Sequence, residues 1–500
     1  IMNKLNADNF PELICKRPEK IIQFGEGNFI RAFMDWIIQQ LNNQNKFNGS
    51  VVAIQPTPHG KVVGKLNTQN GLFTTILRGI QDGQTVNTKE IISSISRGIN
   101  PYTNWQDVLK CAENPEIEIV FSNTTEAGLT YNNQDTATME PPLSFPAKLT
   151  LFLYHRYQYF HGDATKGMYI IPCELLENNG QLLKSIILKY CKQWQLPSDF
   201  ITWLNAHNKF YNTLVDRVVS GYPKDEIETL TQELGYNDIL IACGEPFHFL
   251  AIEGDTSLNE KLPLLNSGLN VVIENDISQY RQRKVRLLNG GHTANVPASF
   301  LAGLNTVAEM MNDQITGKFA QQTINNHILP SISMDKEMLI DFANAVIERF
   351  QNPFIKHQLA SILLNCTSKF KARVLPSILE YHDKFHTFSQ NLSFSFATYI
   401  TLYNTSKING NHFYIEHNGT TCELTDDEYA IQKLTSAWKY YAKTQESATV
   451  VVNEILGDTN LWGINLTTYP ELINDVSKYL YAIDTQNIKQ IMQSLLLNEE

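Results

Sequence analysis

The apolar pattern of the chain changes character near residue 276. Before that point, short runs rich in β-branched residues alternate with amphipathic stretches, as in Ile21–Phe24 followed by Phe29–Leu41. After it, apolar residues recur in series at helical spacing, as in Lys336–Phe350. Strands that alternate with helices favour a doubly wound parallel sheet. Since single cores stop growing near ~250–300 residues, we predict an α/β domain over residues 1–275 and a mostly α-helical domain over residues 276–500.

Other segments give weaker signals of the same kind. The run Leu72–Arg78 favours an antiparallel hairpin strand laid onto the sheet. Further helices are expected at Asn295–Met311 and Phe354–Leu364, and a short strand pair at His412–Ile415 and Thr420–Glu423. Further strands of the first domain are expected at Val51–Ile54, Ile117–Ser122, Met168–Cys173, Ile239–Cys243, Phe247–Ile252 and Asn270–Ile273.

Charge and cysteine usage exclude several classes of protein. The net charge is −11 and the basic residues are scattered, which disfavours binding to nucleic acid. We find neither a signal peptide in residues 1–20 nor a run of about 20 apolar residues, so no membrane partner is expected and a cytoplasmic location is predicted. The seven cysteines form no Cys-x-x-Cys pair, so neither a metal site nor a disulfide framework is expected. The oligomeric state cannot be read from the sequence.

A glycine-rich turn follows the first strand. Gly25-Glu-Gly27-Asn-Phe-Ile30 lies between an apolar strand and a helical pattern, where glycines let backbone amides approach a pyrophosphate. The third glycine of a G-x-G-x-x-G pattern is replaced by Ile30, so an ordinary strand-to-helix turn is an equal alternative. Gln55–Thr57 supplies neither an acid for a ribose nor an arginine for a 2′-phosphate, so these residues leave NAD and NADP both open.

A second polar group begins the helical half. On an α-helix at about 100° per residue, Asn289 lies about 140° and His292 about 80° around the axis from Lys284. All three side chains could then face one cleft, where an amine exchanges a proton with an alkoxide while Asn and His donate hydrogen bonds to the same oxygen. Spacing alone favours a plainer interpretation, with a solvated lysine, a capping asparagine and a histidine at the edge of the core.

Four segments in order resemble the signatures of the mannitol dehydrogenase family of long-chain polyol dehydrogenases. They are Ile21–Ala32, Ser122–Gly128, Thr213–Gly221 and Lys284–His292, and Ile21–Phe29, Val120–Gly128 and Asn352–Leu359 are closer still to members that act on keto-sugar acids. The resemblance implies a Rossmann-type N-terminal domain, a helical C-terminal domain, and metal-independent, NAD-dependent reduction of a ketone. It also implies that Lys284 is the acid/base, supported by Asn289 and His292.

The resemblance carries cofactor contacts onto individual positions of this chain. They are Ile22, Gln23, Phe24, Gly25, Glu26, Gly27, Asn28, Phe29, Ile30, Arg31, Ala32, Asn123, Thr125, Glu126, Asp216 and Arg217. One position departs from the family, because Leu175 stands where many relatives carry the asparagine that helps to bind the reacting oxygen. We therefore name Glu174 and Asn179 as substrate-contacting candidates beside it.

A sugar-acid substrate requires a cation opposite its carboxylate. Lys369 is the first candidate because it ends a segment that resembles the family's substrate-contacting helix, and Lys356, Lys371 and Arg373 are alternatives. Fructuronate reductase and mannitol 2-dehydrogenase would share every catalytic feature named above. A dinucleotide-binding sensor without catalysis is the alternative from a different class.

Overall fold

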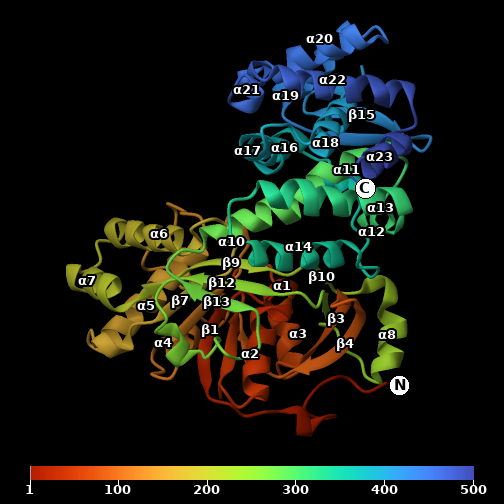
Figure 1. Cartoon of the computed structure of the whole chain (residues 1–500). Helices are drawn as coiled ribbons and strands as arrows, with labels where there is room; N and C mark the ends of the chain where they lie inside the picture. The colour runs from red at the N-terminus through yellow and green to blue at the C-terminus, as the bar shows by residue number, and fades with distance from the viewer. Residues whose placement is uncertain (1, 500) are drawn as a thin grey trace. The chain divides into compact units, whose positions relative to one another are not determined.

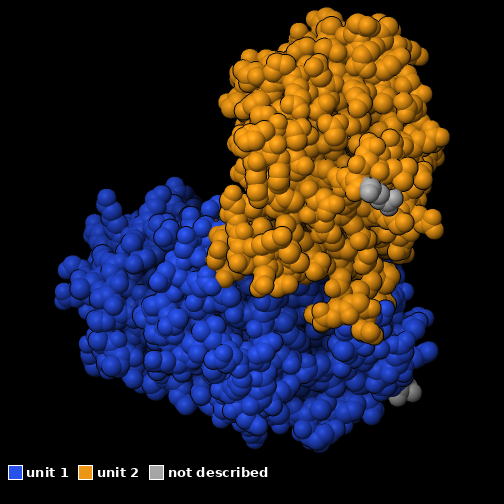
Figure 2. All heavy atoms as spheres, in the orientation of Figure 1, with its two compact units in different colours: residues 1–78, 85–278 blue, residues 79–84, 279–500 orange. Residues whose placement is uncertain are grey.

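The computed structural model describes residues 2–499 and divides into two compact units. Unit 1 comprises the chain up to residue 78 together with residues 85–278, and unit 2 comprises residues 79–84 together with the chain from residue 279 (Figure 2). Both units are built mainly from segments that follow one another in the sequence, the exception being the hairpin tip 79–84.

Unit 1 is built around a parallel sheet, as the apolar runs predicted. In the described part of the chain this sheet has six strands in the order β5-β2-β1-β6-β7-β8, of which β1 and β7 are labelled in Figure 1. They are β1 (Glu19–Phe24), β2 (Ser50–Ile54), β5 (Ile95–Ile99), β6 (Ile119–Ser122), β7 (Tyr169–Pro172) and β8 (Lys209–Phe210). Ile22 of the central strand pairs with Val52 and Val120, and all three are fully buried. Strands covered on both faces are expected to be continuously apolar in this way.

Helices cover both faces of the sheet, which defines the doubly wound arrangement. Successive strand residues point to opposite faces, and accordingly Ile21 and Ile22 belong to two different cores. The first core contains apolar residues of α2 (Met34–Asn43), and the second contains those of α4, α5, α6 and α7. The bounds of these four helices are Trp105–Ala112, Phe145–Tyr159, Asn179–Gln193 and Ser198–His207. The predicted helix at 29–41 is interrupted at Phe33, between α1 (Asn28–Ala32) and α2.

Two smaller sheets correct the prediction of a single one. The predicted hairpin strand is β3 (Phe73–Gln81), which lies in a separate sheet with the order β10-β11-β3-β4. It pairs in parallel with β11, and Ile76 and Cys243 share a small core of their own there. The predicted strands at 247–252 and 270–273 form a third sheet with β9. The remaining bounds are β4 (Gln84–Ile92), β9 (Asn212–Asp216), β10 (Val219–Gly221), β11 (Ala242–Gly244), β12 (Phe249–Glu253), β13 (Val271–Glu274), α3 (Val62–Thr68), α8 (Ile227–Leu234) and α9 (Leu258–Lys261).

Unit 2 is mostly helical, as expected. Its helices are α10 (Ser278–Arg283), α11 (Gly290–Leu301), α12 (Val307–Asn312), α13 (Gln314–Gln322), α14 (Lys336–Phe350), α15 (Leu359–Ile362), α16 (Cys366–Arg373), α17 (Leu375–Phe385), α18 (Gln390–Thr401), α19 (Glu428–Ala437), α20 (Gln445–Leu456), α21 (Thr459–Trp462), α22 (Pro470–Thr485) and α23 (Ile488–Leu497). The strand pair is present as β15 (His412–His417) and β16 (Thr420–Thr425), with β14 (Ile408–Asn409) beside it. None of the helices in residues 2–499 is long and apolar enough to cross a membrane.

Two predicted helices of unit 2 are broken. The pattern at 295–311 divides between α11 and α12 because the chain turns at Gly303, whose φ of +93° lies in the left-handed region that favours glycine. The pattern at 354–364 is helical only over α15. Gln358, immediately before α15, has extended backbone and forms an isolated antiparallel bridge with Thr306.

Candidate active site

The glycine-rich turn follows β1 directly. Gly25 has a φ of +132°, and a Cβ atom there would lie 2.7 Å from the backbone oxygen of Asn123, so only glycine fits between these two strand ends. A Cβ at Gly27 would meet no atom within 4 Å. The first glycine is therefore required by the fold, while the second leaves the outer face of the turn uncovered, as close approach of a pyrophosphate requires.

Polar side chains near this turn brace it from inside. Gln23 Nε2 donates to the carbonyl of Gly25 at 3.1 Å and to Asp35 Oδ2 at 2.9 Å. Arg31 is 2% exposed, donates to Asn28 Oδ1 at 2.9 Å, and lies 5.2 Å from the ring centroid of Phe73. Burial lowers the pKa of Arg31 to about 10 and raises that of Asp35 to about 7. Both side chains thus point into unit 1.

Other residues of the predicted cofactor set are likewise buried in unit 1. Arg217 donates to the carbonyl of Ala32 at 2.7 Å and its guanidinium lies over the Trp36 ring. Glu26 is only 7% exposed, and burial raises its pKa to about 7 against an opposing effect of Arg31. The side chains of Ile22, Phe24, Ile30 and Ala32 are fully buried, and Asp216 is buried at the end of β9.

Four further residues of the predicted cofactor set line a cavity of about 460 Å³ within unit 1. Phe29, Asn123, Thr125 and Glu126 line it together with Ala127 and Leu175. Thr125 has a φ of +70°, which is strained for a β-branched residue and is typical of functional turns. Leu175 is 62% exposed, so this residue, where relatives carry asparagine, presents an apolar surface to the cavity.

Glu174 and Asn179 were predicted as substrate contacts. Their side chains instead join neighbouring strand ends through hydrogen bonds. Glu174 is 1% exposed and accepts hydrogen bonds from Ser122 Oγ at 3.0 Å and from the amide of Thr124 at 3.1 Å. Asn179 is fully buried, donates to the carbonyls of Pro172 and Glu174 and to Thr213 Oγ1, and accepts from two backbone amides. Its amide therefore has no donor left over for another molecule.

In unit 2 the segment Lys284–Asn289 is a π-helix, not the α-helix that the angular argument assumed. The amide of Gly290 donates to the carbonyl of Val285, five residues earlier. Because a π-helix joins residues five apart across one turn, Asn289 lies above Lys284 on the same face, which corrects the expected separation of about 140°. Such turns occur often at functional sites. Lys284 and Asn289 are half-buried.

His292 follows one turn later in α11 and lies in an aromatic setting. Its ring stacks on Phe350 at a centroid distance of 4.0 Å and meets the ring of His357 edge-on at 5.2 Å. Burial lowers the pKa of His292 well below its usual value, and His357 and the cations Arg349, Arg373 and Lys369 lower it further. The imidazole is therefore neutral at pH 7 and has one N–H to donate.

The predicted carboxylate-binding residues differ in exposure. Lys369 is half-buried on α16, and its Nζ donates to the carbonyl of Ile362 at 3.1 Å. Burial lowers the pKa of Lys369, and Arg373 adds to this effect. Lys356 and Lys371 are exposed. Sequence reasoning ranked Arg373 with these surface lysines and overlooked His357, although the four-residue spacing from Lys369 already places Arg373 on the same helical face.

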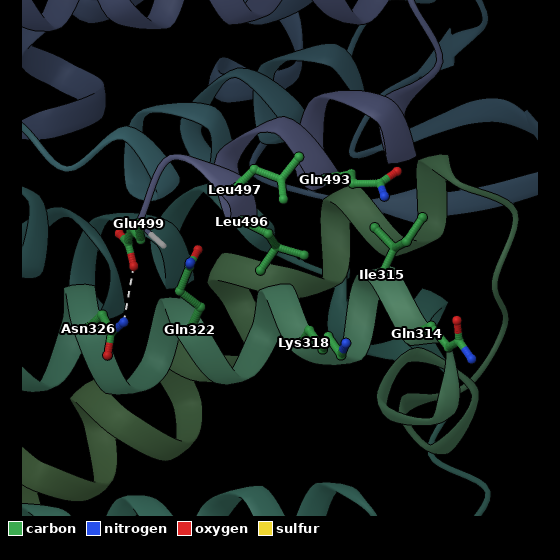
Figure 3. Close-up of a pocket in the computed structure, with 9 residues that line it drawn as sticks. All are labelled: Gln314, Ile315, Lys318, Gln322, Asn326, Gln493, Leu496, Leu497 and Glu499. Carbon is green, nitrogen blue, oxygen red and sulfur yellow. Dashed lines mark hydrogen bonds between the residues drawn. The ribbon is translucent and has the colours of Figure 1, made fainter.

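A separate cavity of about 430 Å³ lies in unit 2 between α13, the π-helical segment Thr323–Ile328 and α23 (Figure 3). Amide side chains and leucines make up most of its lining, and Glu499 accepts a hydrogen bond from Asn326 Nδ2 at 3.0 Å (Figure 3). It includes none of the residues predicted for catalysis. Nor do three His, Cys, Asp or Glu side chains gather anywhere in the described chain as a metal site would require.

Together, a parallel sheet with an open glycine turn and a helical unit with a Lys-Asn-His group define a dinucleotide-dependent dehydrogenase fold. Residues 19–266 match the mannitol dehydrogenase Rossmann domain, and residues 276–484 match the mannitol dehydrogenase C-terminal domain. The chain belongs to the mannitol dehydrogenase family, which confirms the predicted resemblance.

Curated relatives extend the match over nearly the whole chain. An altronate oxidoreductase of Halalkalibacterium halodurans is 42% identical, over 96% of this chain and 93% of its own. One of Pectobacterium atrosepticum is 41% identical, over 98% and 99%. Among solved structures, mannitol 2-dehydrogenase of Pseudomonas fluorescens, in complex with NAD and D-mannitol, aligns over 99% of both chains with a TM-score of 0.66 and 20% identity. A D-sorbitol dehydrogenase aligns with a TM-score of 0.75 and 19% identity, over 98% of this chain and 100% of its own. These two structures establish the fold.

Proposed function

We propose that the protein reduces the ketone of tagaturonate to the alcohol of altronate with NADH, and catalyses the reverse reaction with NAD. The observation that carries the proposal is a Lys284-Asn289-His292 group on one π-to-α helical segment, in a chain 41–42% identical to altronate oxidoreductases. In this proposal the partner is a small sugar acid and the reaction takes place in the cytoplasm. Neither nucleic acid nor a membrane is proposed as a partner.

The chain's own residues perform the proton chemistry in this proposal. The nicotinamide, when bound, supplies or accepts the hydride. Lys284 gives its proton to the oxygen of the former ketone, and takes one from the alcohol in the reverse direction. Asn289, on the same face as Lys284, and the neutral His292 donate hydrogen bonds to that oxygen and so stabilise its developing negative charge.

Cofactor binding in this proposal uses the uncovered turn at Gly27 for the pyrophosphate and the cavity lined by Phe29, Asn123 and Thr125 beside it. NAD is the proposed cofactor. Gln55, at the end of β2, is 2% exposed and donates to the carbonyl of Thr57 at 2.7 Å, so it offers no charge to a 2′-phosphate.

The test is a parallel assay of NADH oxidation with tagaturonate, fructuronate and fructose. We expect tagaturonate to give the highest kcat/KM. A preference for fructuronate or fructose would assign the chain to fructuronate reductase or mannitol 2-dehydrogenase activity instead. No turnover of any of the three, with NADH still bound, would favour a dinucleotide-binding sensor.

A further inference from the structure

Two cations project from one face of α16. Lys369 and Arg373 are four residues apart, which makes them neighbours on a helix. Both are half-buried. Like charges at this spacing destabilise a helix, and removing them from water without a counterion adds a further cost. A pair of this kind therefore requires an explanation that helix stability does not provide.

In the part of the chain that the structure describes, no carboxylate pairs with either cation. Within residues 2–499 the guanidinium of Arg373 makes no hydrogen bond or ion pair, and the amine of Lys369 donates to a backbone carbonyl. The acid whose charge reaches Lys369 is Asp426. Asp426 is buried at the opposite end of α16, where it accepts from the amide of Thr367 at 3.1 Å and from its hydroxyl at 2.6 Å. Its carboxylate is thus used to cap the helix.

The pair lies beside the predicted catalytic segment. A Cβ at Gly290, the residue after Asn289, would come within 2.8 Å of the backbone oxygen of Arg373, so this end of α16 packs directly on the π-to-α junction. Helices α11 and α16 lie side by side in unit 2 (Figure 1). The charges of Lys369 and Arg373 both act on His292, whose ring touches that of His357.

We propose that Arg373 and Lys369 form the subsite for the carboxylate of a sugar-acid substrate, with Arg373 as the residue that determines specificity for the acid. This inference rests on the proposed function and deepens it. A planar guanidinium can hold a carboxylate through two parallel hydrogen bonds, whereas an ammonium acts as a single point charge. The substrate's negative charge supplies the counterion that residues 2–499 do not provide.

The primary test compares Arg373→Met with Lys371→Met. Lys371 lies on the same helix and is exposed. Its replacement by Met removes one positive charge, as Arg373→Met does, so Lys371→Met is a matched control. Each variant is assayed with tagaturonate and with tagatose, which has a hydroxymethyl group in place of the carboxylate. For Arg373→Met we expect KM for tagaturonate to rise about 100-fold, as for the loss of one partner from a buried charge pair. KM for tagatose, the Kd of NADH and the melting temperature should remain near the parent's.

Arg373→Lys should recover only part of the affinity, because the charge is restored without the paired hydrogen bonds. Lys371→Met should match the parent with both substrates. An Arg373→Met variant that keeps the parent's KM for tagaturonate overturns the subsite while leaving the proposed function intact.

A binding measurement separates the two hypotheses if the parent fails to reduce tagaturonate. Altronate, with neutral altritol for comparison, is titrated against the protein and the rise in melting temperature is recorded. We expect altronate alone to stabilise the parent and Lys371→Met, and to have little effect on Arg373→Met. Equal stabilisation of the parent and Arg373→Met, or none of the parent, would refute the subsite whatever the activity.

Discussion

The two units use buried charge in opposite ways. Around the glycine turn of unit 1, Arg31, Asp35 and Glu174 are nearly or fully buried and engaged with neighbouring protein groups. On α16 of unit 2, Lys369 and Arg373 are half-buried with no carboxylate opposite them in the described chain. From this difference we expect unit 1 to bind its ligand mainly through backbone groups and unit 2 mainly through side chains. Substitutions in the two units should therefore fail in different ways.

The largest expected effect tests the side chains of unit 2. Lys284→Ala should lower kcat by about 10²–10⁴, the usual contribution of positioned proton transfer. NADH affinity should stay at the parent's value, because the dinucleotide turn belongs to unit 1. Stopped-flow and equilibrium fluorescence measurements with NADH would check both expectations. Turnover within a few-fold of the parent would remove Lys284 from the mechanism.

The next effect concerns substrate affinity. Lys369→Met should raise KM for tagaturonate by about 100-fold or less, because part of the carboxylate's binding passes to Arg373. It should also narrow the preference for tagaturonate over fructose while leaving the Kd of NADH unchanged. Steady-state kinetics with both substrates provide the measurement. Equal handling of both by variant and parent would mean that Lys369 makes no contact with the carboxylate.

Substitutions in the glycine-rich turn test the role of unit 1 in the same comparison. Gly27→Val places a side chain in open space, so the protein should fold while NADH binding weakens by about tenfold or more. Gly25→Val should instead prevent folding, because its Cβ would approach the Asn123 carbonyl at 2.7 Å. Melting curves and NADH titrations distinguish the two outcomes. Unchanged NADH affinity in folded Gly27→Val would contradict the proposed position of the pyrophosphate.

The smallest expected effect is a pH dependence of stability. Burial raises the pKa of Glu26 from 4.5 to about 7, so the folded state favours the protonated acid. Its contribution to stability is complete below pH 4.5 and is lost as the pH rises towards 7, where the folded state must also ionise it. Relative to Glu26→Gln, the parent's melting temperature should fall by about 2–4 °C over that range. Parallel melting profiles for the two proteins would show that Glu26 does not titrate as expected.

Much of the fold of unit 1 could be predicted because its central strands are buried on both faces. Apolar runs such as Val51–Ile54, and Ile21–Phe24 with Gln23 as its one polar residue, leave little choice of structure. The short strands β9 to β13 were assigned to the wrong sheet or missed, because a period of two does not reveal the pairing partner. Pairing depends on contacts distant in sequence, such as Thr75 with Ala242.

For the candidate site, residue types could be predicted better than their arrangement. Lys284, Asn289 and His292 were predicted from the sequence, but an α-helical period gave a separation of about 140° between Lys284 and Asn289, which the π-helix reduces. Arg373 was named only as an alternative to Lys369, because a basic side chain is usually a solvated surface charge. The packing of its backbone on Gly290 and its half-buried position distinguish it from the exposed Lys371.

The π-helical turn has a consequence for insertions and deletions. A turn that closes between residues five apart contains one residue more than the α-helical turn it replaces. Deleting a single apolar residue between Lys284 and Asn289 would let the segment relax into a continuous α-helix. After such a deletion the asparagine would lie four residues and the histidine seven residues after Lys284, positions that an α-helix of about 100° per residue also places on the face of Lys284. The π-helical turn thus accommodates one extra residue between Lys284 and Asn289 while keeping the polar residues on one face.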